Sequence, residues 1–115
     1  MLRVVLVAAS IGATALVGFT QTDRIDTILA HPLQWDGKHV HVTGAVMRLE
    51  ERTALDGRDY DVFDLCNAGC IRVFTGGRPA LSEGQKLSVQ GTFSSAKRVG
   101  DFDVDNDIET DEGSL

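Results

Sequence analysis

The sequence predicts an all-β domain, a small closed barrel of five strands that follows a short helix. The stretch Gly37–Val46 is repeated by Gly84–Phe93, and in both an apolar residue occupies every second position, as in a strand with one buried face. Gly44 and Gly91 each replace one of these apolar residues in mid-strand. An inward glycine suits a strand that bends at a barrel corner, and the two further apolar stretches between the repeats fit a hairpin.

The first 22 residues form a separate segment. Arg3 precedes Val4–Phe19, which carries no charge and many small side chains, and a polar stretch follows. This order of basic, apolar and polar residues is typical of a secretory signal peptide. The apolar stretch is slightly short for a bilayer span, so an uncleaved membrane anchor is the alternative. We therefore expect a signal peptide (or anchor) over residues 1–22 and one domain over residues 23–115.

The charge balance is acidic, with 11 Lys and Arg against 17 Asp and Glu. Affinity for nucleic-acid backbones comes largely from Lys and Arg, which release counterions from the phosphates. An acidic domain is therefore a poor general binder of nucleic acid, although local basic clusters keep that function open. A chain of 115 residues has room for one domain and not two.

A short helix is expected to begin after Asp23, because an aspartate is a favourable N-cap. Pro32 ends this helix, since the residue before a proline avoids the helical conformation. We expect Trp35 to pack the helix onto the barrel.

Five strands follow, separated by polar loops over residues 50–57 and 94–100. In the second strand the alternation is broken, because Phe63 and Leu65 share one face while Tyr60 and Val62 share the other. Either a bulge shifts the register or both faces of this strand are covered. The expected strands are His39–Leu49, Arg58–Leu65, Cys70–Phe74, Lys86–Phe93 and an acidic last strand that contains Phe102, Val104 and Ile108.

This order of strands, with a capping segment over residues 75–84, resembles the OB-fold, the oligonucleotide- and oligosaccharide-binding fold. The residues that carry the resemblance are Val40–Val46, Tyr60–Leu65, Gly69–Val73, Gly84–Gly91 and Asp107–Glu109. The likeness covers about residues 25–109 and is greatest to the small exported bacterial OB-fold proteins and the tRNA anticodon-binding-like modules. It implies a five-stranded Greek-key barrel of the OB type. It says little about the ligand, because many unrelated activities share this fold.

The resemblance also implies where a ligand would bind. In OB-folds the loop after the first strand, the loop before the last strand and the face of the second and third strands form the groove. Arginines that bind phosphates and phenylalanines that stack on bases would suit single-stranded nucleic acid. The alternative is solvated loop charge with aromatic residues in the core, since three aspartates lie on the second strand. The groove residues expected here are Arg48, Arg52, Arg58, Phe63, Arg72, Phe74, Lys97 and Arg98.

Cys66 and Cys70 bracket the turn between the second and third strands. In an exported chain such a pair is expected to form a disulfide, and neither OB-fold subgroup requires it. A metal site or a redox-active pair are the alternatives, although redox dithiols usually have two intervening residues and a helix N-terminus. A signal segment together with a disulfide predicts a periplasmic or secreted protein.

Two patterns carry metal-ligand chemistry. His39 and His41 lie on one face of a strand, about 7 Å apart, and would need a third ligand to hold zinc or copper. The stretch Asp101–Glu112 matches much of an EF-hand loop, but Asn106 replaces the required glycine, so we expect a strand. The weak metal candidates are His39, His41, Asp101, Asp103 and Asp105.

No Ser/His/Asp or Cys/His arrangement and no phosphate-binding loop stands out, so we expect neither an enzyme nor a cofactor. The expected function is an exported, non-catalytic OB-fold binding module of the cell envelope that recognises a small ligand, a glycan or a protein partner. The alternatives are a binder of single-stranded nucleic acid and a periplasmic protein that binds a divalent metal. Membrane contact is expected only if the N-terminal segment stays uncleaved.

Overall fold

The computed structural model describes residues 22–99, 102–112 and 115, and the side chains of residues 97–99 and 102–103 lie outside this description. Nearly all of the predicted signal segment, residues 1–22, therefore lies outside the described residues. Two short helices come first, α1 (Ile25–Ala30) and α2 (Pro32–Trp35). Asp23 does not cap α1 as expected, because its carboxylate accepts the backbone N–H of His41. Within the described residues, no helix is long and apolar enough to cross a membrane.

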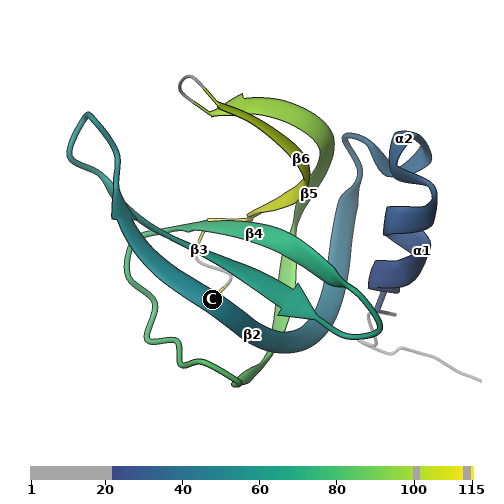
Figure 1. Cartoon of the computed structure of the whole chain (residues 1–115), viewed down its shortest axis with the longest axis horizontal. Helices are drawn as coiled ribbons and strands as arrows, with labels where there is room; N and C mark the ends of the chain where they lie inside the picture. Colours follow the sequence, from purple (N-terminus) through teal and green to yellow (C-terminus); the bar gives the residue numbers. More distant parts are fainter. Residues whose placement is uncertain (1–21, 100–101, 113–114) are drawn as a thin grey trace, which may run out of the picture.

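Five strands form one sheet that closes on itself in the order β2-β3-β4-β6-β5, which confirms the predicted mostly-β architecture (Figure 1). All neighbouring strands are antiparallel except β4 and β6, which run parallel over three residue pairs. The strands are β2 (His39–Thr53), β3 (Asp59–Cys66), β4 (Cys70–Gly76), β5 (Lys86–Val99) and β6 (Phe102–Thr110).

Two hairpins extend further than the sequence predicted. Strand β2 continues to Thr53, so its loop to β3 shortens to residues 54–58. Strand β5 continues to Val99 and pairs with β6 as far as Phe102, so residues 94–99 are strand and the predicted polar loop is wrong. Figure 1 shows both hairpins projecting away from the helices. Polar residues dominate these extensions because two paired strands outside the core need no apolar face.

The core fills the inside of the sheet. Phe63, Phe93 and Ile108 are fully buried there, and Ile25 and Ile28 of α1 join the same cluster. Trp35 packs against this cluster from α2 and is half-buried, as predicted. The β3–β4 turn lies against α1, because the Cβ position of Gly69 is 3.7 Å from Ile25 and from Leu29. The helices therefore cover the end of the barrel at which β3 turns into β4 (Figure 1).

Two glycines allow the sheet to close. A Cβ atom on Gly44 would lie 2.8 Å from the backbone oxygen of Cys66, and one on Gly91 would collide with the backbone of Glu109. Both glycines lie on the buried face, where β2 and β5 each pass from one neighbour to the next. No side chain fits at either position, as expected for inward glycines in mid-strand.

Candidate binding site on the outer face of β3 and β4

Alternation assigns the two faces of β3 and β4. Ile71 and Val73 of β4 point into the core, so Cys70, Arg72 and Phe74 point outward. In the register between the strands, Asp64 lies opposite Arg72 and Val62 lies opposite Phe74. Strand β3 is buried on both faces, which explains its broken alternation.

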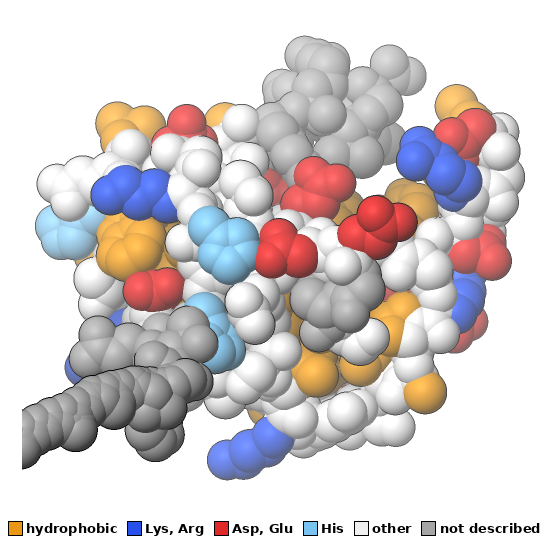
Figure 2. Space-filling view, turned by 180° about the vertical axis from the view of Figure 1, so that it is seen from behind, with side chains coloured by type: hydrophobic (Ala, Val, Ile, Leu, Met, Phe, Trp, Pro, Cys, Tyr) orange, Lys and Arg blue, Asp and Glu red, His pale blue; other side chains and the backbone are white. Residues whose placement is uncertain are grey.

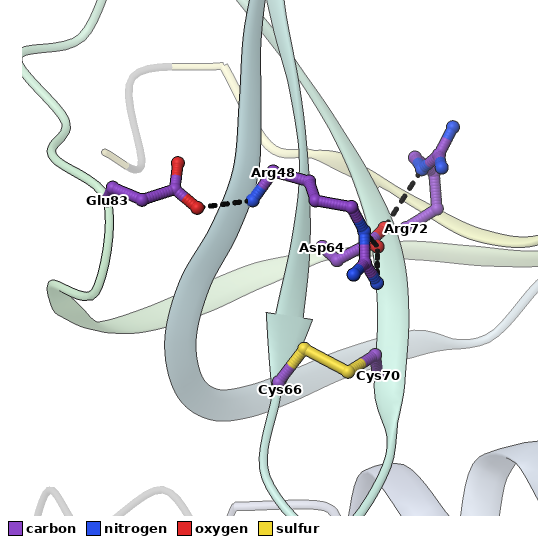
Figure 3. The surroundings of a disulfide bond; sticks show 6 residues. All are labelled: Arg48, Asp64, Cys66, Cys70, Arg72 and Glu83. Atoms are coloured by element: carbon purple, nitrogen blue, oxygen red, sulfur yellow. Dashed lines mark hydrogen bonds and ion pairs between the residues drawn. A yellow bond between two sulfur atoms is a disulfide. The ribbon is translucent and has the colours of Figure 1, made fainter.

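On this outer face a single carboxylate binds two arginines (Figure 3). Arg48 donates from Nε to Oδ2 of Asp64 at 2.8 Å, and Arg72 donates from Nε to Oδ1 at 3.0 Å. The Asp64 side chain is 10 % exposed, whereas those of Arg48 and Arg72 are 68 % and 43 % exposed. Hydrogen bonds to a mostly buried carboxylate are strong, so Asp64 holds both guanidinium groups in fixed positions.

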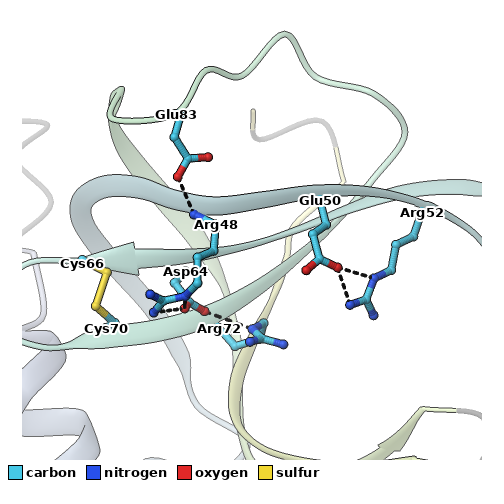
Figure 4. Close-up of polar contacts among 8 residues, drawn as sticks. All are labelled: Arg48, Glu50, Arg52, Asp64, Cys66, Cys70, Arg72 and Glu83. Atoms are coloured by element: carbon cyan, nitrogen blue, oxygen red, sulfur yellow. Dashed lines mark hydrogen bonds and ion pairs between the residues drawn. A yellow bond between two sulfur atoms is a disulfide. The ribbon is translucent and has the colours of Figure 1, made fainter.

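A bulge in β2 brings Arg48 to this position. Met47 pairs with Asp64 but Glu50 pairs with Val62, so β2 has one extra residue between them. Arg48 adopts the left-handed conformation, with a φ of 51°. The bulge frees two backbone N–H groups, and the Glu83 carboxylate accepts both, from Arg48 at 2.6 Å and from Leu49 at 3.1 Å. Glu83 thus fixes the backbone from which Arg48 reaches Asp64 (Figure 4).

A hollow of about 640 Å³ opens beside this cluster. Its walls come from four elements: α1, the bulge of β2, the β3–β4 hairpin near its turn, and the middle of β6. Two arginines and two aspartates give this lining no net formal charge. The lining residues are Leu29, Arg48, Asp64, Cys70, Arg72, Val104, Asp105 and Asn106.

A second hollow, of about 650 Å³, lies at the other end of β4. Its aromatic part consists of Tyr60 and Phe74, whose ring centroids are 6.4 Å apart with the planes inclined at 30°. Arg58 and Glu109 also line it. Figure 2 views the whole molecule from behind and shows acidic side chains near the middle of this view and basic side chains towards its edges.

The predicted groove residues are therefore divided between two places. Arg48 and Arg72 meet at Asp64, whereas Arg58 and Phe74 line the second hollow. Phe63 is fully buried and belongs to the core, because it points to the inner face of β3. Lys97 and Arg98 lie on β5, paired with Val104 and Asp103 of β6, and their side chains lie outside the described residues.

The last groove residue, Arg52, pairs with an acidic neighbour, and so does Arg58. Arg52 donates to Glu50, and this bond raises the pKa of the Arg52 guanidinium (Figure 4). Arg58 contacts Asp56 through both its backbone N–H and its guanidinium, and these contacts lower the pKa of the Asp56 carboxyl. The positive charge of each arginine is therefore largely balanced by its acidic neighbour.

Three residues whose side chains hold neighbouring polar groups in place were not identified from the sequence, namely Asp64, Glu83 and Arg78. The pairing of Asp64 with Arg72 could have been read from the turn, since both lie four residues from Ala68 at the centre of the hairpin. No local pattern links Glu83 to the bulge in β2. Arg78 donates to Asp61 at 2.9 Å and to the carbonyl of Tyr60 at 2.7 Å, so it joins the β4–β5 connection to β3.

Cys66 and Cys70 form the predicted disulfide, which closes the β3–β4 hairpin directly beside the arginine cluster (Figure 3). Cys66 and Cys70 are paired in the ladder, and the next outward pair along it is Asp64 and Arg72. The disulfide therefore helps to fix the wall of the first hollow to which Cys70 contributes.

Among the metal candidates whose side chains the structure describes, none joins a group of possible ligands. His39 pairs with Asp111 at 2.6 Å, and Asp105 is exposed on β6. Asp103 is described only by its backbone, and Asp101 lies outside the described residues. In the part of the chain that the structure describes, no three His, Cys, Asp or Glu side chains form a group that could hold a metal ion.

Fold and site together define a small, disulfide-linked β-domain with two hollows along the outer side of β4. Comparison of the chain with protein-family models, with curated proteins and with solved structures finds no match.

Proposed function

We propose that this chain is an exported, non-catalytic binding module of the OB type, which recognises a ligand or partner of the cell envelope at the outer face of β3 and β4. The OB-type assignment is supported by the strand order. Strands β2, β3 and β4 follow one another as neighbours, and β5 then returns to lie beside β2, which is the connection of a Greek key. Strand β6 closes the ring between β4 and β5.

Export is supported by the Cys66–Cys70 disulfide. Disulfides persist in oxidising compartments and are rare in the cytosol, where thiols are kept reduced. The apolar segment after Arg3 agrees with this assignment, because a secretory signal begins in the same way.

The observation that carries the binding proposal is the arginine pair held by Asp64 above the first hollow. Three elements fix these side chains: the bulge in β2, the Glu83 carboxylate and the disulfide-closed hairpin. A fixed polar site loses little side-chain entropy when a ligand binds, and surface arginines without such support lose more.

Single-stranded nucleic acid is the less favoured ligand. The lining of the first hollow is neutral overall, and Arg58 at the second hollow is already paired with Asp56. The phosphates of a nucleic acid would therefore meet few Lys or Arg side chains that are not already paired with a carboxylate. The chain as a whole also carries a formal net charge of −6, which repels phosphates.

Two measurements test this proposal. Mass spectrometry of the chain from its native host should show an envelope protein that lacks roughly the first 20 residues and contains no free thiol. Envelope small molecules, glycans and peptides should include a fraction that raises the melting temperature of the wild type and not of Arg72→Gln. A cytoplasmic chain with an intact Met1 and two alkylatable cysteines would contradict export. If a ligand raises the melting temperature of Arg72→Gln as much as that of the wild type, the proposed binding site is wrong.

A further inference from the structure

The edge of β6 is unpaired where it passes the first hollow. Strand β6 runs from Phe102 to Thr110, but its ladder with β4 covers only Asp107–Glu109. Before that point, Val104 and Asp105 pair with β5 alone. Among the described residues, none of the backbone hydrogen bonds of turns, loops and caps involves Val104 or Asp105, and neither residue belongs to the β4–β6 ladder.

The first hollow lies along this edge. Cys70 and Ile71 begin β4 but do not pair with β6, so the two strands diverge on this side of their short ladder. Val104, Asp105 and Asn106 line the hollow on one side, and Cys70 and Arg72 line it on the other. An unpaired strand edge beside an open hollow is the arrangement that accepts an added peptide strand.

The direction in which a peptide adds to β6 decides which of its ends meets the arginines. Strands β4 and β6 are parallel, and Arg72 lies at the first pair of their ladder, opposite Asp107. A peptide that runs parallel to β6 ahead of this ladder points its carboxyl end towards Arg72. A terminal carboxylate binds well to the fork of donors on a guanidinium group. Asp64 accepts a hydrogen bond from Nε of Arg72. The two terminal nitrogens of Arg72 can therefore donate to a ligand.

We propose that the first hollow binds the free carboxyl-terminal segment of a partner protein. The segment adds to the β6 edge as a short parallel strand, and Arg72 and Arg48 bind its terminal carboxylate. This inference rests on the proposed binding function and names the partner class of the same site.

The charge of the hollow adds a preference for the peptide sequence. Asp105 is exposed on β6, on the outward face and close to the path of the added strand. Opposite charges on neighbouring strands attract, and like charges repel. A Lys or Arg near the carboxyl end of the peptide therefore fits, whereas an acidic residue there does not. The net charge of −6 favours the same basic partners.

The test uses the full oxidised chain and a pooled library of random octapeptides with free carboxyl ends. Affinity selection should enrich peptides with a basic residue near the carboxyl end. The strongest peptide should bind at least tenfold more tightly as the free acid than as its C-terminal amide, because a charge-assisted hydrogen bond is lost. Its binding should also protect the amides of Val104–Asn106 from hydrogen exchange, which strand addition predicts and simple charge attraction does not.

Variants separate this site from general electrostatics. Arg72→Gln and Arg48→Gln should each lower the affinity for the selected peptide about 10- to 100-fold. Arg58→Gln is the matched control, since it removes the same charge from another exposed, acid-paired arginine and should change the affinity less than twofold. Asp105→Asn should remove the preference for a basic residue. Far-UV circular dichroism and melting curves identify any variant that fails to fold, and the two arginine variants report on the site independently.

The outcomes distinguish this inference from the proposed function. Enrichment of no peptide, or equal affinity of acid and amide, overturns carboxyl-end recognition. If a neutral glycan array then gives binding that depends on Arg72, the binding function stands and the partner class is wrong. If no peptide, glycan or envelope small molecule binds in a way that depends on Arg72, both proposals fail.

Discussion

The Glu83 carboxylate accepts the backbone N–H of Arg48 at 2.6 Å, across 35 residues of chain. Its second oxygen accepts the N–H of Leu49 at 3.1 Å. The connection between β4 and β5 thus stabilises a bulge in β2, and the bulge aims Arg48 at Asp64. A residue outside the strands thereby determines the geometry of the candidate site.

Replacing Glu83 should loosen this bulge. Glu83→Ala leaves two N–H groups without their acceptor in an exposed setting, so we expect a loss of about 1 kcal/mol in the free energy of unfolding. Glu83→Gln keeps one acceptor oxygen and should lose less. Urea denaturation measures both. Glu51→Ala is the control, because Glu51 is exposed on β2, the strand that carries the bulge, and makes no described side-chain hydrogen bond. Equal losses in Glu83→Ala and Glu51→Ala would refute the role of Glu83 at the bulge.

The features of the fold that depend on local sequence patterns could be predicted from the sequence. Alternating apolar residues located the core strands, Gly44 and Gly91 were recognised as inward positions without a side chain, and two cysteines around a turn in a chain expected to be exported predicted the disulfide. The ends of the two hairpins were missed because residues 50–53 and 94–99 lack an alternating apolar pattern, and residues 50–53 are all exposed. A strand without such a pattern has the composition of a loop.

The candidate site was harder to predict because long-range contacts form it. Arg48 and Arg72 were both singled out from the sequence, but Asp64, which brings them together, was taken only as a counter-charge. Phe63 was assigned to the groove because the broken alternation of β3 left its face undetermined. The bulge that changes the register lies in β2, and its stabilising partner Glu83 has no signature in the sequence.

Gly91 should tolerate no side chain. In Gly91→Ala the new Cβ atom would collide with the backbone of Glu109 in β6, which cannot rotate away as a side chain would. We expect a destabilisation of about 2–3 kcal/mol or failure to fold. Gly76→Ala is the matched control, since Gly76 also lies in a strand but a Cβ atom there meets nothing within 4 Å. Thermal melting of both variants checks this, and comparable melting temperatures would show that the β5–β6 contact can adjust.

The disulfide should contribute modestly to the free energy of unfolding, and its main effect should be to keep the β3–β4 hairpin of the candidate site closed. Its loop is short, so cross-linking removes only about 2 kcal/mol of entropy from the unfolded chain. Cys66→Ser/Cys70→Ser should therefore fold, with a melting temperature lowered by roughly 8–16 °C for a domain of this size. Hydrogen exchange should show faster opening at the β3–β4 turn than at the barrel core. A uniform increase in exchange over all strands would mean that the disulfide supports the whole fold and not this hairpin.

Arg78 should stabilise the chain by compensating a buried charge. Asp61 is 2 % exposed, and Arg78 is 2.9 Å from its carboxylate while also donating to two backbone carbonyls, those of Tyr60 and Arg52. Arg78→Met leaves Asp61 charged and buried without this partner, which should cost about 3 kcal/mol.

Adding Asp61→Asn to Arg78→Met removes the uncompensated charge and should recover part of that loss. The double mutant should therefore be more stable than Arg78→Met alone, as denaturant unfolding of the four proteins in the cycle would show. Arg52→Gln is the control for loss of a surface arginine, because Arg52 pairs with the exposed Glu50 and should contribute less than 1 kcal/mol. If Arg78→Met costs no more than Arg52→Gln, water reaches Asp61 and the end of the barrel is open. A cost near 3 kcal/mol with recovery in the double mutant identifies Arg78 as the residue that compensates the buried Asp61 carboxylate.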